Sequence, residues 1–136
     1  MVKFFIPGNP VSKGRPKFAV RGGFARAYTP SKTRDYESIV AKYGLEAIAK
    51  PLEGPLCVDL NFALPIPAST SKKLAKTLLN TPHQKKPDLD NLIKSVTDGL
   101  NGIAYFDDSQ IAELRARKIY SANPGVSVDI SAINWW

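Results

Sequence analysis

The sequence has little of what a disulfide-stabilised or membrane protein needs. Cys57 is the only cysteine among 136 residues, so no intrachain disulfide framework is possible and a reducing compartment is expected. No apolar run approaches the roughly 20 residues that cross a bilayer. The first apolar residues are interrupted at Pro7, too early for a signal peptide. We therefore expect a soluble, cytoplasmic protein that has no membrane partner.

Internal repeats, low-complexity tracts and long linkers are also absent, so the length suits one domain spanning residues 1–136. The hydrophobic fraction of 43% is sufficient for a core. Lys and Arg outnumber Asp and Glu by nineteen to twelve, a formal charge of +7. Such a surplus favours a polyanionic partner, most often nucleic acid. An anionic membrane surface is the alternative, but no strongly basic amphipathic helix supports it.

Turn residues and hydrophobic periodicity predict a mixed α+β domain, a small sheet covered on one face by helices. The expected strands are residues 3–6, 17–20, 24–28, 57–64, 111–120 and 125–133. Gly22-Gly23 predicts a hairpin between the second and third strands, and Asn123-Pro124-Gly125 predicts one between the last two. The expected helices run from residue 31 to about 50, from 71 to 79 and from 88 to 100.

The third expected helix separates apolar from charged residues. Leu89, Leu92, Val96 and Leu100 fall on one side and are expected to be core. Asp90, Lys94 and Asp98 follow one another at intervals of four and form a row on the opposite side. This row is also what a solvated face with two weak ion pairs would show. Asp88 lies where the helix begins, a position at which a carboxylate commonly caps the first amides.

A second acidic pair, Asp107-Asp108, follows one short turn later. Its ordinary interpretation is a turn, where Asp bonds to nearby backbone. Together, however, five aspartates lie between Asp88 and Asp108 in a protein of net charge +7. A hard divalent cation such as Mg²⁺, which takes oxygen ligands, would account for that crowding. Mg²⁺ beside Lys and Arg suits phosphodiester hydrolysis. Lys94, one turn after Asp90, is well located to supply the positive side chain that stabilises charge on the phosphate.

At these residues the sequence resembles the RusA family of Holliday junction resolvases. The matching signature runs from Lys86 through Asp-Leu-Asp-Asn-Leu-x-Lys (88–94), Asp98 and Asp-Asp-Ser-Gln (107–110) to Lys118. Two amino-terminal segments, residues 10–17 and 28–30, also resemble the opening of that family. The resemblance implies a homodimer that binds four-way junctions and makes paired, symmetric nicks with Mg²⁺ or Mn²⁺, without an organic cofactor.

The resemblance also implies residue roles. The catalytic, metal-binding aspartates map onto Asp88, Asp90 and Asp108, with Asp107 as the alternative to Asp108, and the catalytic lysine maps onto Lys94. The residues expected to contact DNA are Lys13, Arg15, Lys17, Lys85, Lys86 and Lys118. Such phosphate contacts would make affinity fall steeply with salt.

Two other functions remain open at this stage. The chain could be a non-catalytic DNA-binding protein whose aspartates only cap and solvate a helix. It could also be a nuclease that acts on branched or flapped DNA other than Holliday junctions.

Overall fold

A computed structural model describes residues 1–15, 17–28 and 30–135, without the side chains of Lys17, Ala19, Arg21, Phe24, Arg26 and Tyr28. No helix of this part is both long enough and apolar enough to cross a membrane. The elements in chain order are β1 (Val2–Pro7), β2 (Lys17–Arg21), β3 (Phe24–Tyr28), α1 (Ser31–Ala47), β4 (Leu56–Pro65), α2 (Lys72–Leu78), α3 (Leu89–Gly99), the 3-10 turn η1 (Asp108–Gln110), β5 (Ile111–Ser121) and β6 (Gly125–Ala132).

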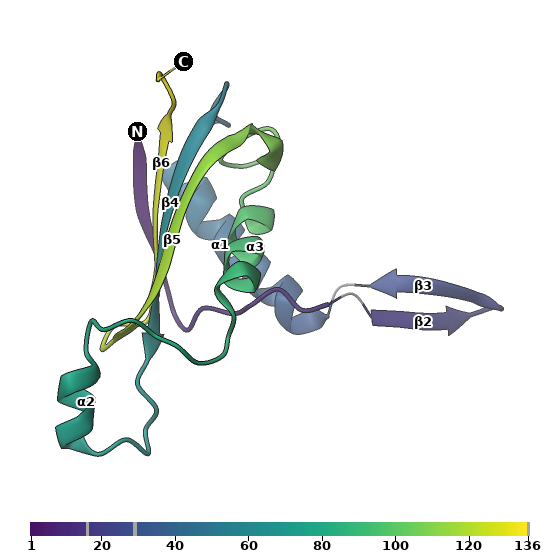
Figure 1. Cartoon of the computed structure of the whole chain (residues 1–136). Helices are drawn as coiled ribbons and strands as arrows, with labels where there is room; N and C mark the ends of the chain where they lie inside the picture. Colours follow the sequence, from purple (N-terminus) through teal and green to yellow (C-terminus); the bar gives the residue numbers. More distant parts are fainter. Residues whose placement is uncertain (16, 29, 136) are drawn as a thin grey trace.

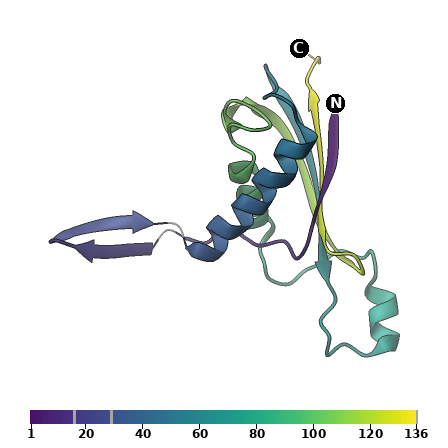
Figure 2. The same cartoon turned by 180° about the vertical axis from the view of Figure 1, so that it is seen from behind.

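Four strands form a mixed sheet in the order β1-β6-β4-β5, and α1 and α3 lie together on one of its faces (Figures 1 and 2). β4 alternates as predicted, with Val58, Leu60 and Phe62 buried on the helix side and Asp59 and Asn61 half-buried on the other. The mixed α+β architecture with helices on one face is therefore confirmed. One boundary differs: α1 ends at Ala47, because Ile48 turns to extended backbone and is buried.

The predicted pairing of the last two strands is wrong. Residues 122–124 do reverse the chain, but β4 lies between β5 and β6, pairing parallel with β5 and antiparallel with β6. This order gives the most apolar strand two hydrogen-bonded neighbours. It leaves β5, which carries Glu113, Arg115 and Arg117, at the sheet edge, where charged side chains are tolerated and discourage pairing with another chain.

Two glycines bring α1 and α3 into close contact. A Cβ at Gly99 would lie 2.9 Å from the Cβ of Val40, and one at Gly44 would lie 2.7 Å from Leu100 Cδ2. Leu92, Val96 and Leu100 are buried as predicted, whereas Leu89 is only partly buried. Because the apolar side of α3 is held in this way, its charged side is directed away from the core.

Candidate functional site

The carboxylates of α3 begin at its N-terminus, where Asp88 occupies the N-cap position without capping the helix. Its backbone is extended, and its side chain accepts no hydrogen bond from a helix amide. Instead, Lys86 Nζ lies 2.9 Å from Asp88 Oδ1 and 3.0 Å from Oδ2. The side chain of Asp88 is about half exposed, so the structure argues against the capping interpretation. This carboxylate is therefore held by the exposed Lys86 and not by the helix, and it stays accessible to solvent.

The charged row of α3 does not form the two ion pairs that a solvated face would show. Asp90 is exposed, and its Oδ1 accepts a hydrogen bond from the backbone N–H of Asn91 at 2.9 Å. Within the part of the chain that the structure describes, Lys94 forms no ion pair with Asp90 or Asp98. Lys94 is exposed, and its ammonium group is available to an external anion.

Asp98 is paired with a residue far away in the sequence. Lys13 Nζ lies 3.2 Å from Asp98 Oδ2 and 2.6 Å from Glu37 Oε1 of α1. The backbone N–H of Lys13 also donates to the carbonyl of Asn91 at 2.8 Å. Burial lowers the pKa of Lys13, but the hydrogen bonds and charges of Glu37 and Asp98 outweigh this and raise it above the usual 10.5. Lys13 therefore joins the N-terminal segment to both helices.

The second acidic pair lies at the C-terminal end of α3, where the structure gives its two members different roles. Asp107 Oδ2 accepts the backbone N–H of Ser109 at 3.0 Å and caps η1, which lowers the pKa of Asp107. The backbone N–H of Asp108 donates to Asn101 Oδ1 at 3.1 Å. In the described part, no hydrogen bond or ion pair occupies the carboxylate of Asp108.

Gln110, the last residue of the Asp-Asp-Ser-Gln segment, fixes this acidic turn, a role that the sequence alone did not predict. Its Oε1 accepts the backbone N–H of Phe106 at 2.7 Å, and its Nε2 donates to the carbonyls of Leu52 and Gly54 at 3.0 and 2.9 Å. The spacing Asp107-x-x-Gln110 could have revealed this role, because it resembles a capping box.

Buried Tyr105 lies among the acidic groups at this end of α3. Its hydroxyl donates to the carbonyl of Thr97 at 2.6 Å. Burial raises the pKa of Tyr105, and the negative charges of Asp108, Asp98 and Asp107 raise it further. Asp98, Asp107 and Asp108 thus lie close enough to Tyr105 for their charges to disfavour ionisation of its hydroxyl.

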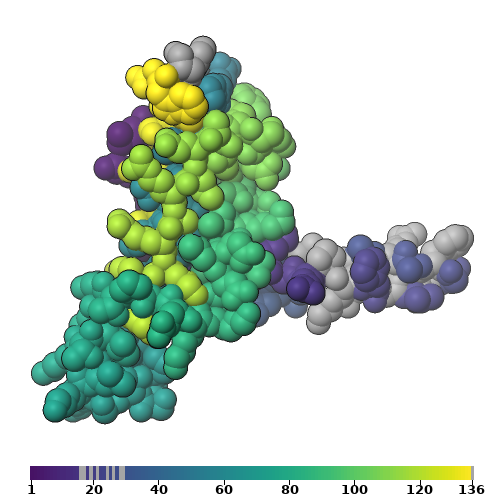
Figure 3. Space-filling view, viewed as in Figure 1, coloured from purple at the N-terminus to yellow at the C-terminus, as the bar shows by residue number. Residues whose placement is uncertain are grey.

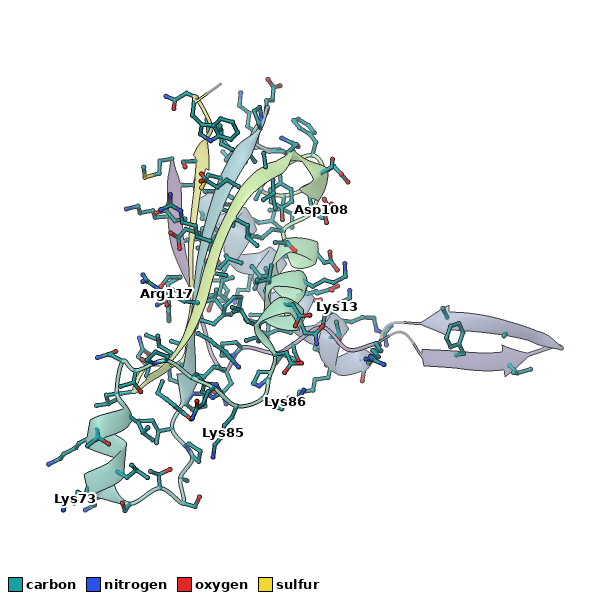
Figure 4. All side chains as sticks on the ribbon, in the orientation of Figure 1. Lys13, Lys73, Lys85, Lys86, Asp108 and Arg117 are labelled. Atoms are coloured by element: carbon teal, nitrogen blue, oxygen red, sulfur yellow. The ribbon has the colours of Figure 1, made fainter. Side chains whose placement is uncertain are left out.

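The three predicted metal ligands do not converge in the isolated chain. Figure 4 shows Asp108 toward one end of α3 and Lys86, which holds Asp88, toward the other end. The eleven residues of α3 span about 16 Å. Among the described residues, no three His, Cys, Asp or Glu side chains lie close enough together to hold a metal ion. The oxygen donors suit Mg²⁺ chemically, but their arrangement supplies no complete site.

Comparison with known proteins identifies the family. Residues 7–131, nearly the whole chain, match the family described as Endodeoxyribonuclease RusA. The chain belongs to the RusA family. It is also 34% identical over 140 residues to the uncharacterized protein YqaN of Bacillus subtilis (strain 168), an alignment that covers 98% of this chain and 97% of that protein.

In this RusA chain, the expected DNA-contact residues fall into two groups. Arg15, Lys85 and Lys86 are exposed, although Lys86 is also paired with Asp88, and the side chain of Lys17 lies outside the described residues. Lys13 is occupied by Glu37 and Asp98, as described above.

Lys118 is also occupied. Its ammonium group donates to the carbonyls of Lys85 and Pro87, the latter at 2.8 Å, and its own carbonyl accepts the N–H of His83. The ring of His83 also lies 4.5 Å from the ring of Tyr120, which is on β5 like Lys118. Lys118 thus holds the basic loop of residues 81–87 along β5, next to the start of α3. The geometry gives Lys13 and Lys118 positioning contacts that the sequence did not reveal.

Proposed function

We propose that this RusA-family chain is a Mg²⁺-dependent endonuclease that resolves four-way DNA junctions by paired, symmetric nicks. The observation that carries the proposal is the uncapped start of α3. There the half-exposed carboxylate of Asp88 and the exposed Asp90 lie beside the basic loop of residues 81–87, and Lys94 follows one turn later. Carboxylates for a divalent cation, placed beside cations for phosphate, are what phosphodiester hydrolysis requires.

Asp88, Asp90 and Asp108 are the proposed metal ligands. Mg²⁺ keeps several waters and is usually held by one or two carboxylates together with substrate phosphates, so a complete carboxylate triad is not a prerequisite for binding. When bound, the ion would supply an activated water and neutralise charge on the phosphate. Mn²⁺ is an expected substitute. Lys94 is the proposed catalytic cation, because its ammonium group forms no ion pair among the described residues and can stabilise negative charge that grows on the phosphate oxygens.

Asp108 is preferred over Asp107 as the third carboxylate. The cap that Asp107 forms on Ser109 occupies one of its oxygens, whereas the carboxylate of Asp108 has no such partner among the described residues. If Asp107 turned to bind a metal ion, η1 would lose the hydrogen bond from Ser109 N–H to Asp107 that caps it. This preference is consistent with the resemblance, which also maps the role onto Asp108.

The proposed assembly is a homodimer, because a four-way junction has approximate twofold symmetry and two identical sites could cut opposing strands. Arg15, Lys17, Lys85 and Lys86 are proposed to bind the DNA backbone. Lys13 and Lys118 belong to the same proposed DNA-binding surface. Their existing contacts favour a role in positioning the protein segments that bind DNA. Affinity should fall steeply with salt.

The decisive experiment compares junction nicking by the wild type, Asp90→Asn and Asp108→Asn, with Mg²⁺ and with EDTA. We expect each substitution to lower the nicking rate by about 100-fold or more, because a lost metal contact costs several kcal/mol of transition-state stabilisation. Asp107→Asn should retain most of the nicking activity, and Asp35→Asn, an exposed position on α1, serves as the charge-matched control. Full activity of folded Asp90→Asn would refute the assignment. Flap and linear duplex substrates at equal salt test the preference for four-way junctions.

The lack of three converging metal-binding side chains among the described residues favours one alternative, a junction-binding protein that does not cut. That alternative predicts tight junction binding without nicks in any divalent ion. It also predicts that Asp88→Asn and Asp90→Asn leave the affinity for Mg²⁺ unchanged.

A further inference from the structure

The net positive charge of the chain comes from its first quarter. Residues 1–34 contain no Asp or Glu, and they hold eight of the nineteen basic residues. These are Lys3, Lys13, Arg15, Lys17, Arg21, Arg26, Lys32 and Arg34. The remaining residues, 35–136, carry eleven basic and all twelve acidic residues. The surplus of positive charge therefore lies in residues 1–34, where Lys3 and Lys13 are paired with acidic side chains and the β2–β3 hairpin contributes Lys17, Arg21 and Arg26.

This hairpin projects away from the rest of the molecule (Figures 1, 2 and 3). β2 and β3 form a two-stranded sheet of their own, joined by Gly22 and Gly23 at φ +58° and +83°. Each five-residue strand extends about 17 Å. The base of the hairpin is anchored: the N–H of Gly14 donates to Thr33 Oγ1 at 2.9 Å, and Lys13 holds α3. The residues just outside the hairpin are thus held against α1 and α3, and the hairpin itself forms an arm.

The arm exposes large apolar side chains. Phe18 is 73% exposed and Val20 is 75% exposed. Side chains two positions apart lie on the same face of a strand. Their cross-strand partners, Ala27 and Ala25, are small and exposed, so neither covers the ring of Phe18. The same two strands contain Lys17, Arg21 and Arg26 in their sequence and no acidic residue. Such a surface suits a partner that is both polyanionic and able to cover an aromatic ring.

We infer that Phe18 stacks on unpaired or unstacked bases at the branch point of DNA while the basic residues of the arm hold the surrounding phosphates. This inference rests on the proposed function. DNA meets both requirements, because its bases offer apolar faces for stacking and its backbones carry the negative phosphates. A second copy of the hairpin is disfavoured as the occupant, because it would bring an equal surplus of positive charge. In a continuous duplex the bases stack on each other, so Phe18 contributes chiefly to branched DNA.

The test measures affinity without cleavage. Fluorescence anisotropy in EDTA gives Kd for a synthetic four-way junction and for a linear duplex of the same sequence and salt. Phe18→Ala is expected to raise Kd for the junction by about 5- to 150-fold, the equivalent of the usual 1–3 kcal/mol for one stacked base. Kd for the duplex should change by less than about twofold on the same reasoning. Phe18→Trp should retain junction affinity, and Leu45→Ala, 64% exposed on α1, is the matched control.

A 2-aminopurine placed at the branch point gives a direct second signal. Its fluorescence should be quenched by the wild type and by Phe18→Trp, and much less by Phe18→Ala. Unchanged junction affinity in Phe18→Ala would overturn the inference, as would equal losses on junction and duplex. A change in the sedimenting mass of Phe18→Ala would also overturn it, by assigning the face to contact between copies. Nicking by the wild type tests the proposed function separately, so that failure of one does not imply failure of the other.

Discussion

Replacing Lys13 with methionine should destabilise the fold, because this ammonium group neutralises two carboxylates from different helices. Glu37 of α1 and Asp98 of α3 lie 2.6 and 3.2 Å from Lys13 Nζ. Methionine preserves most of the apolar stem of the side chain. The variant therefore tests the charge and leaves two carboxylates near one another without a counterion.

The expected loss follows from how far the three groups are removed from water. The side chains of Lys13, Glu37 and Asp98 are 19%, 23% and 25% exposed. Breaking a fully buried pair costs about 3–5 kcal/mol, and an exposed pair contributes about 0–1 kcal/mol. We expect an intermediate loss of about 2–3 kcal/mol in the free energy of unfolding. For a chain of this length that corresponds to a fall in Tm of about 8–12 °C.

Urea denaturation followed by circular dichroism measures this loss, with Lys3→Met as the matched control. Lys3 forms the exposed pair with Asp129 at 3.6 Å, and its loss should cost less than about 1 kcal/mol. A loss below about 1 kcal/mol for Lys13→Met would refute the reasoning, since Lys13 would then behave as an ordinary surface lysine. The double variant Lys13→Met/Glu37→Gln should recover part of the loss, because one of the orphaned charges is removed.

The pH dependence of this difference has a defined sign. The pKa of Lys13 in the folded protein is raised above the usual 10.5, so folding favours its protonated form. Its contribution to stability is fully present below about pH 10.5 and is lost as the pH rises through the folded pKa. The gap between wild type and Lys13→Met should therefore be constant near neutral pH and shrink in strongly alkaline buffer.

Two further predictions concern the packing of α3 and the loop before it. Gly99→Ala should lower stability by about 1–2 kcal/mol, because the overpacking at Val40 outweighs the helix propensity gained. The same substitution should cost much less in a Val40→Ala background, and equal losses in both backgrounds would exclude the steric explanation. Lys118→Met should speed amide hydrogen exchange in residues 81–87 and lower the nicking rate, because two loop carbonyls lose their donor. Unchanged exchange would show that the loop is held by its backbone contacts with β5 alone.

The sequence by itself determined most of the local structure and the family. Alternation in residues 57–64, the apolar side of α3 and the Gly22-Gly23 turn each depend on spacings of a few residues, and the structure confirms all three. The aspartates from 88 to 108 and their basic neighbours were readable for the same reason. Their proposed roles as metal ligands come from chemistry and from family resemblance.

Tertiary structure decided which distant groups meet. The turn at residues 122–124 fixed a reversal of the chain, but only competition among all strands placed β4 between β5 and β6. The pairing of Lys13 with Asp98, and of Lys118 with loop carbonyls, joins residues whose separation in sequence carries no periodic signal. A charged residue has the same appearance in a sequence whether it binds a ligand or another part of the chain. Only the folded geometry, by setting distance and burial, distinguishes these roles.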